Sequence, residues 1–249
     1  MIQALLKRRI WLWQNRMIPG LILIFTLPLF VFSLINLPLR NILIQSLTGI
    51  PFDDWIYTGM IFIVAAFGLF PLIYRDFFNL RIHRKLLTNI ALAPYSKQMM
   101  IAGYLCVATL EALTMGMIAM VIYSFIIPFP LTVIQLVSMI FYFIIFILIL
   151  GNLFITLSLA VNSPTTYMMF TFLIFLLVIF GSGLIIEFGF FPMTFEKVLI
   201  WLPLAIPIRA MHFFMISGII DWTLTAISIA FCIFWSIANG IYLKEKLCQ

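Results

Sequence analysis

Few side chains in this sequence could carry acid–base or metal chemistry, and they are widely spaced. The chain has two histidines, His83 and His212, and eight acidic residues. Glu111 is the only charged residue well inside a long apolar stretch. A carboxylate is costly to bury there, so Glu111 is a candidate for a polar translocation path or a proton site. The alternative is a structural glutamate that is protonated or hydrogen-bonded between two helices.

The short motifs of enzymes and nucleotide-binding proteins are missing from the sequence. It contains no H-E-x-x-H, no G-x-x-x-x-G-K-[ST] and no G-x-S-x-G. Its three cysteines are scattered and show no C-x-x-C spacing, so they predict neither a disulfide framework nor a metal site. We therefore expect no catalytic residue, no metal and no cofactor bound by this chain, which would then not be an enzyme by itself.

Composition places the chain in a membrane. Of its 249 residues, 65% are hydrophobic and 9% are charged, whereas an average soluble domain has about 25% charged residues. A soluble domain of this size could not bury so much apolar surface. The net charge of +6 comes from basic residues beside apolar runs, which is typical of orientation signals. We expect contact with membrane lipids and no binding of nucleic acid.

Six apolar runs are long enough to cross roughly 30 Å of hydrocarbon as helices. They lack the alternation of a membrane β-barrel, so the predicted fold class is an all-α membrane protein, with one transmembrane domain over 1–249. The predicted spans are 17–39, 55–74, 98–127, 132–161, 166–186 and 222–243. Residues 1–16 predict an interfacial helix, in which Arg9 and Arg16 fall near the apolar side and would have to extend to the headgroups.

Basic residues are concentrated on one side of these spans. With the N-terminus in the cytoplasm, eleven Lys and Arg residues lie on the inner side and three on the outer side. This bias sets orientation, and the even number of spans then places both termini in the cytoplasm. Trp55 and Trp222 fall at the predicted outer interface, where aromatic belts form.

The segment 187–221 is apolar but interrupted. It contains one glycine and three prolines that break helices, namely Gly189, Pro192, Pro203 and Pro207. A seventh crossing over 198–220 is possible by length, but it would bury Arg209 near mid-membrane. We favour a re-entrant outer segment, which is tolerated only against protein or a wet cavity.

The inner segment 75–97 holds an amphipathic pattern. Leu80, His83, Leu87 and Ile90 recur at helical spacing with basic residues on the other faces, and Pro94 ends the predicted helix. A short basic helix of this kind binds anionic lipid or docks into a groove of a cytoplasmic partner.

The order of these elements resembles the membrane subunit of type-2 ABC exporters over nearly the whole chain. Leu92-Ala93-Pro94 followed by Ile101-Ala102-Gly103-Tyr104 resembles the family's apolar–small–proline step and the start of its third span. Gly181-Ser182-Gly183 resembles its serine–glycine element, and the later prolines and Ile216-Ser217-Gly218 resemble its re-entrant helices and the step into span six. Two positions depart from the pattern. Asn89 stands where the family often has glutamate, and Arg209 follows Pro207 by two residues where the family's arginine often comes later.

This resemblance implies the permease subunit of an ABC transporter. It would lie in a bacterial inner (plasma) membrane and export an amphipathic substrate such as a lipid-linked glycan, a drug or a peptide. A separate P-loop ATPase subunit would bind ATP and Mg²⁺, and a second permease copy, identical or similar, would complete a dimer. The alternatives are an ion-coupled secondary transporter or channel that uses Glu111, and a purely structural membrane protein.

The resemblance also assigns two groups of site residues. The ATPase-coupling helix would use basic, polar and apolar side chains of the inner segment, namely Arg81, His83, Arg84, Lys85, Leu87, Thr88, Asn89 and Pro94. The outer gate would use the residues that break helices near the other end, namely Gly181, Gly183, Pro192, Pro203 and Pro207.

Overall fold

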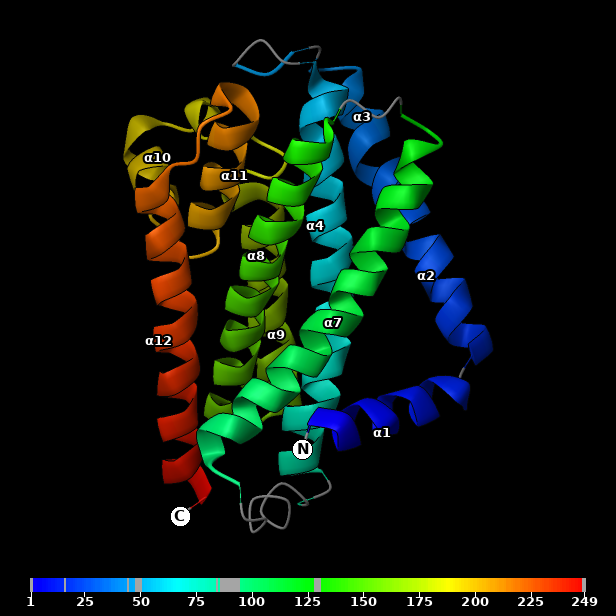
Figure 1. Ribbon diagram of the computed structural model, residues 1–249, viewed down its shortest axis with the longest axis vertical. Coiled ribbons are helices and arrows are strands. Elements are labelled where there is room, and N and C mark those ends of the chain that lie inside the picture. The colour runs from blue at the N-terminus through cyan, green and yellow to red at the C-terminus, as the bar shows by residue number, and fades with distance from the viewer. Residues whose placement is uncertain are drawn as a thin grey trace.

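The computed structural model describes most of the chain as helix (Figure 1). The described residues are 2–15, 17–43, 45–47, 51–83, 85, 95–127 and 131–247. Within them, extended pairing is limited to one isolated bridge between Gln45 and Pro51. Among these residues, six helical runs are long and apolar enough to cross a membrane, namely Met17–Arg40, Phe52–Ile82, Lys97–Ser124, Val133–Ala160, Pro164–Gly181 and Trp222–Lys246. The predicted all-α fold is confirmed, and the six runs agree with a multi-pass membrane protein.

Three of the six runs are regular α-helices, and three contain a wider π-helical turn. The regular ones are α7 (Lys97–Ser124), α8 (Val133–Ala160) and α12 (Trp222–Leu247). The first run joins α2 (Met17–Val31) and α3 (Leu37–Arg40) through the π turn Phe32–Asn36. The second joins α4 (Phe52–Ile73) and α5 (Leu80–Ile82) through the π turn Tyr74–Asn79, and the fifth joins α9 (Pro164–Leu176) to the π turn Leu177–Gly181. Single π turns within α-helices frequently mark functional positions.

The helices define two ends of the bundle (Figure 1). α1 (Ile2–Gln14) and the end of α12 lie at what we call the basal end. α3, the start of α4, and the short helices α10 (Met193–Leu199) and α11 (Ala205–Ser217) lie at what we call the apical end. A 3₁₀ turn, Phe188–Phe190, precedes α10.

α4 is the central helix of the bundle. In its most apolar stretch 83% of the residues are buried within the chain, against 17% in the first run, and α7 and α8 pack on it. The outward faces of α2, α9 and α12 carry large apolar side chains such as Phe25, Phe172 and Phe234, which are exposed. An apolar outer surface around a packed core is what lipid contact requires, because lipid solvates apolar side chains.

Polar side chains join α8 to α12 within the apolar bundle. Asn152 donates to Ser236 Oγ at 2.9 Å, and Asn239 donates to the Asn152 carbonyl at 2.9 Å. Thr156 donates to Asn239 at 2.7 Å and accepts from the Trp235 indole at 2.9 Å. Such bonds are worth about 0.6 kcal/mol each on average between membrane helices, so the chain of bonds fixes the register of the two helices.

Side chains also define where the helices begin. Thr132 and Gln135 form a capping box at α8, and Ser96 caps α7. Asp221 accepts from the Thr223 hydroxyl and from the Leu224 N–H at the start of α12, and these bonds hold the pKa of Asp221 below its usual value. The start of α12 is thereby fixed at Trp222.

Two helical runs end five or more residues away from the predicted ends of their spans. The fifth span ends at Gly181 rather than at 186, because the chain leaves the helix at the Gly181-Ser182-Gly183 step. The second run continues to Ile82, eight residues beyond the predicted end at Tyr74, because a π turn carries the helix through the charged residues. The predicted inner helix lies largely within 86–94, outside the described residues.

Candidate functional site

A cluster of buried charges at the basal end joins α1 to the long helices. Arg9 of α1 donates to Asp76 at 2.5 Å, and its Nε lies 3.3 Å from Glu111 of α7. Trp13, one turn further along α1, donates its indole N–H to Glu111 at 2.8 Å. Only 9% of the Arg9 side chain, 6% of Asp76 and 14% of Glu111 is exposed. We call Arg9, Trp13, Asp76 and Glu111 the basal charge cluster.

The expected position of Arg9 is wrong. The sequence places it at the edge of an apolar helix face, from which it would extend to lipid headgroups. In the structure this edge faces the bundle, and Arg9 is one of the buried residues of α1. The reason is that two carboxylates, Asp76 and Glu111, lie opposite and compensate its burial.

Two further arginines surround Asp76. Arg8 lies 3.8 Å and Arg75 3.5 Å from its carboxylate, and both are partly exposed. Asp76 belongs to the π turn that follows α4, where the extra residue per turn changes the direction of the following side chains. This turn brings the carboxylate under α1, so a residue predicted for an inner loop becomes part of the bundle.

Glu111 is therefore a paired residue. A cavity of about 330 Å³ opens beside it between α1 and α7. Its walls are mostly apolar, from residues such as Ile10, Met17 and Leu110, with Arg9 and Glu111 at its base. The Glu111 carboxylate joins α1 to α7 through Arg9 and Trp13, as expected for a structural glutamate that is hydrogen-bonded between two helices. The same residue also lines the cavity.

The predicted coupling residues are only partly described. Arg81 donates to the carbonyls of Leu159, at 2.9 Å, and of Val161, so it binds the free carbonyls at the end of α8. His83 is exposed near the Phe78 ring, and Lys85 is exposed. The other predicted coupling residues, Arg84, Leu87, Thr88, Asn89 and Pro94, lie outside the described residues.

The predicted gate glycines lie at a buried break in the chain. Gly183 has φ of +85°, a conformation that side chains with a Cβ rarely adopt. Beyond it the non-helical backbone packs on α4, where a Cβ on Gly59 would lie 2.3 Å from the Leu184 carbonyl oxygen. Gly181 is also buried, and a Cβ there would lie 3.3 Å from the side chain of Leu199 of α10. The break is thus covered by protein, as irregular backbone at membrane depth requires.

The predicted gate prolines begin or separate the two short apical helices. Pro192 precedes α10, and Pro203 lies in the turn between α10 and α11. Pro207 lies in the first turn of α11, where its missing N–H breaks no helical hydrogen bond. Arg209 of α11 donates to the Ile200 carbonyl at the end of α10, at 3.1 Å, and so holds the pair together.

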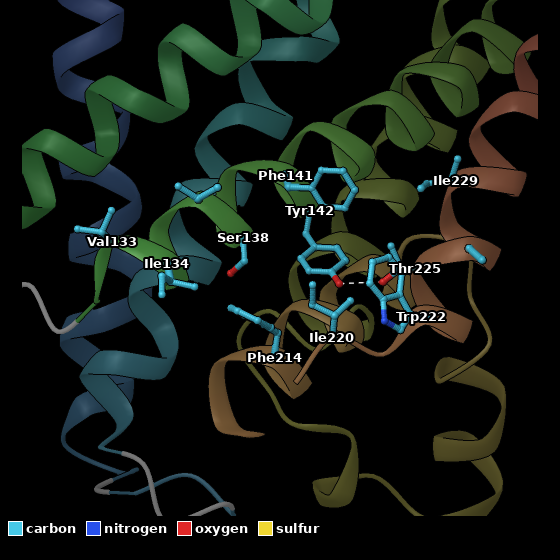
Figure 2. A pocket seen from close by; sticks show the side chains of 12 residues that line it. Val133, Ile134, Ser138, Phe141, Tyr142, Phe214, Ile220, Trp222, Thr225 and Ile229 are labelled. Atoms are coloured by element: carbon cyan, nitrogen blue, oxygen red, sulfur yellow. Dashed lines mark hydrogen bonds between the residues drawn. The ribbon is translucent and has the colours of Figure 1, made fainter. Parts of the chain in front are cut away.

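An apolar groove of about 610 Å³ opens at the apical end between α8, α11 and the start of α12 (Figure 2). Figure 2 shows Phe141, Phe214 and Trp222 around it, with the Tyr142 hydroxyl bonded to Thr225 at 2.8 Å. The hydroxyl of Ser138 is bonded to its own helix. Because these hydroxyls are already paired, the groove offers mainly apolar contact and suits an acyl chain or a similar apolar group.

Sequence reasoning missed several of these residues. Arg9 and Asp76 were assigned to a headgroup layer and to a loop, and Gly59 carried no motif. Trp55, expected in an exterior aromatic belt, is buried against His212, with 3.8 Å between the ring centres.

Among the described residues, no group of three His, Cys, Asp or Glu side chains is placed to hold a metal. Comparison with family models, with curated proteins and with solved structures gave no significant match.

Proposed function

We propose that this chain is the permease subunit of an ABC transporter that exports an amphipathic substrate. Its partners in this proposal are a P-loop ATPase, which binds ATP and Mg²⁺, and a second permease copy. The chain would lie in a bacterial inner membrane with its basal end in the cytoplasm. The proposal rests on the family resemblance of the sequence and on the geometry of the two ends.

The basal charge cluster is the observation that carries the proposal. The helical run Phe52–Ile82 contains Asp76 and all of α4. The predicted coupling segment begins at the end of this run, at Arg81. Arg9 binds that run to α1 and to Glu111 of α7. A force applied to α1 or to the coupling segment would therefore reach both α4 and α7, which is the mechanical connection that a separate ATPase needs.

The apical end supports the export part of the proposal. Buried irregular backbone after Gly181, two short helices and an apolar groove lie together there, away from the predicted ATPase side (Figure 1). In the proposal α10 and α11 enter the outer leaflet and return, and the break at Gly183 is the point that moves. The groove would accept the apolar part of the substrate.

The ion-coupled alternative depends on Glu111 and makes a different prediction. A proton or ion site needs a carboxylate that changes its partner or its protonation during transport. The alternative expects transport without an ATPase, and it expects Glu111→Gln to abolish that transport while the protein remains folded. The permease proposal expects a stability defect instead, because the amide cannot form an ion pair with Arg9.

The first test is purification of the tagged chain in mild detergent after co-expression with its neighbouring genes. The permease proposal expects a P-loop ATPase to co-purify near one-to-one and to hydrolyse ATP. If the chain purifies alone and still transports after reconstitution, the proposal is wrong.

A second test addresses the coupling helix predicted from the sequence. Leu87→Pro should break that helix, so that transport is lost while ATP hydrolysis and membrane insertion persist. Leu87→Ala is the matched control, because it removes a side chain but keeps helix propensity. Transport at the wild-type rate in Leu87→Pro would show that this segment does not couple.

A further inference from the structure

A second apolar groove lies on the outside of the bundle, between α7 and α12. It has a volume of about 500 Å³. Its lining extends along α7 from Gln98 to Leu113 and along α12 from Cys232 to Ile237, and it includes Ile144 of α8. We call it the α7–α12 groove. It is closer to the basal end than the first apolar groove, which adjoins the start of α12.

The groove is closed at its basal end, where α7 and α12 meet. A Cβ on Gly240 would lie 2.6 Å from the Cγ atom of Gln98 and 3.1 Å from its Cα atom, so a side chain there would force the helices apart. From this contact the two helices diverge towards the apical end (Figure 1). The groove therefore begins at Gln98 and opens sideways to lipid, where Ile233 and Ile237 are exposed.

The dimensions of the groove decide what can fill it. From Gln98 to Leu113 it is about 22 Å long at 1.5 Å per residue of α7. Its volume of about 500 Å³ over that length gives a mean cross-section of about 23 Å². An α-helix with its side chains is about 10 Å wide, with a cross-section of roughly 80 Å². A helix of a partner or of a second copy is therefore too wide, whereas a single extended hydrocarbon chain fits.

The length of the groove also suits such a chain. One leaflet contributes about 15 Å of the roughly 30 Å of hydrocarbon in a bilayer. A chain that enters from the basal leaflet can therefore lie in the groove over its whole length.

The basal end of the groove is positively charged. Ile237, Gly240 and Lys244 share one face of α12, because they are spaced by three and four residues. Lys244 is exposed and lies one turn beyond the contact between Gly240 and Gln98. The first turn of α7 adds the positive end of its helix dipole at the same place. Glu245 belongs to another face of α12, since successive residues of a helix point about 100° apart.

We propose that the α7–α12 groove binds one anionic phospholipid. One acyl chain lies along α7, and the phosphate lies beside Lys244 and the start of α7. A zwitterionic headgroup binds less well, because its ammonium group is repelled by Lys244. This binding does not depend on the proposed transport function.

The first measurement identifies the lipid that stays bound. The full chain is placed in nanodiscs with equal amounts of phosphatidylglycerol and phosphatidylcholine that carry the same acyl chains, and it is then released in a mass spectrometer. A single phosphatidylglycerol should be retained in preference to phosphatidylcholine. Lys244→Gln should reduce this preference about fivefold, since one lysine near an anionic headgroup contributes about that factor. Lys246→Gln is the matched control and should leave the preference unchanged, because Lys246 lies over the Tyr242 ring on another face.

A second measurement locates the acyl chain. Cys106 lines the groove and is exposed, so it can carry a trifluoroethylthio label for ¹⁹F NMR in a chain with Cys232→Ala and Cys248→Ala. Phosphatidylglycerol with a nitroxide on its acyl chain should broaden this signal more than the corresponding phosphatidylcholine at the same content. In a background without Cys106, the same label on Val121→Cys is the control, because Val121 is exposed on α7 outside the groove. Both lipids should broaden the control signal equally.

Filling the groove tests whether the lipid binds inside it. Ala102→Phe places a ring in the groove and should abolish the retention of phosphatidylglycerol. Ala238→Phe is the matched control, because Ala238 is exposed on the opposite side of α12. This control should retain phosphatidylglycerol as the unchanged chain does.

Three results would overturn the proposal. One is equal retention of the two lipids by the unchanged chain, because the groove would then not select an anionic headgroup. Another is an equal loss of preference in Lys244→Gln and Lys246→Gln, which would indicate a general effect of surface charge. The third is undiminished retention of phosphatidylglycerol by Ala102→Phe, which would mean that the lipid binds elsewhere.

Discussion

Arg9 joins two carboxylates that the sequence separates by 35 residues, Asp76 and Glu111. A buried ion pair is not strongly stabilising in itself, because desolvation offsets most of the Coulomb attraction. Removing one partner has a larger effect, because it leaves a buried charge without compensation. Arg9 is the partner that both acids share, so its loss affects both at once.

Replacing Arg9 with methionine, which keeps an unbranched apolar stem but removes the charge, should destabilise the protein by about 3–5 kcal/mol. The measurement is the midpoint of thermal unfolding in detergent, and Lys7→Met on the exposed side of α1 is the control. Adding Asp76→Asn to Arg9→Met should recover part of the loss. Equal midpoints for the two single variants would show that Arg9 is not compensating buried charge.

At this scale the sequence identified one of the four residues of the basal charge cluster. Glu111 could be predicted because it is the one acid in a long apolar run. Arg9 could not, because the periodicity of α1 gives its faces but not which edge meets α7. Asp76 could not either, because local hydropathy ends at Tyr74 whereas the helix continues through a π turn.

At the scale of elements, the break in the fifth helical run at Gly181-Ser182-Gly183 is held by close contact between the backbone that follows it and the backbone of α4. The chain beyond Gly181 has lost its helical hydrogen bonds and approaches α4 at Gly59. The sequence marks Gly181-Ser182-Gly183 as part of the outer gate, but the predicted span runs through this step to 186. The partner of this segment on α4 could not be predicted, because nothing local marks Gly59 as the point where another segment passes.

Gly59→Ala should disturb this contact. The new Cβ would lie 2.3 Å from the Leu184 carbonyl oxygen, a backbone atom that cannot rotate away. We expect a lower unfolding midpoint and greater accessibility of the segment 182–187, measured by hydrogen exchange. Gly20→Ala is the matched control, because its Cβ would meet only Trp13 at an ordinary 3.6 Å and should gain helix propensity. A midpoint for Gly59→Ala as high as that for Gly20→Ala would contradict the close contact.

At the scale of the whole molecule, both described chain ends lie at the basal end and α10 lies at the apical end (Figure 1). The number of spans and their order could be predicted because length and hydropathy determine them directly. Packing could not be predicted in this way, because α4 is central and α2 is peripheral although the run that contains α2 is the more apolar of the two. Which apolar face meets protein and which meets lipid is decided by shape and not by hydropathy.

Cysteine labelling tests this arrangement. In a background without Cys106, Cys232 and Cys248, a membrane-impermeant thiol reagent should react in intact cells with Thr194→Cys of α10. It should react with Gln3→Cys of α1 only after permeabilisation. Both positions are exposed, so access differs only by side. Labelling of both variants in intact cells would contradict the predicted orientation, since the two helices would share one side.

The two amino-terminal helices, α1 and α2, contact each other, and each of them also contacts α7. α1 meets α7 at Glu111, α2 meets it again where the Tyr123 hydroxyl donates to the Pro28 carbonyl at 2.9 Å, and α1 and α2 adjoin where Trp13 packs on Gly20 (Figure 1). Because α1, α2 and α7 contact one another at these three places, none of the three helices can rotate relative to the other two unless one contact opens. A displacement of α1 along the membrane surface must therefore appear as tilting of α2 relative to α4. Among the described residues no hydrogen bond is found where Trp13 packs on Gly20, so this contact between α1 and α2 is the one that would open first.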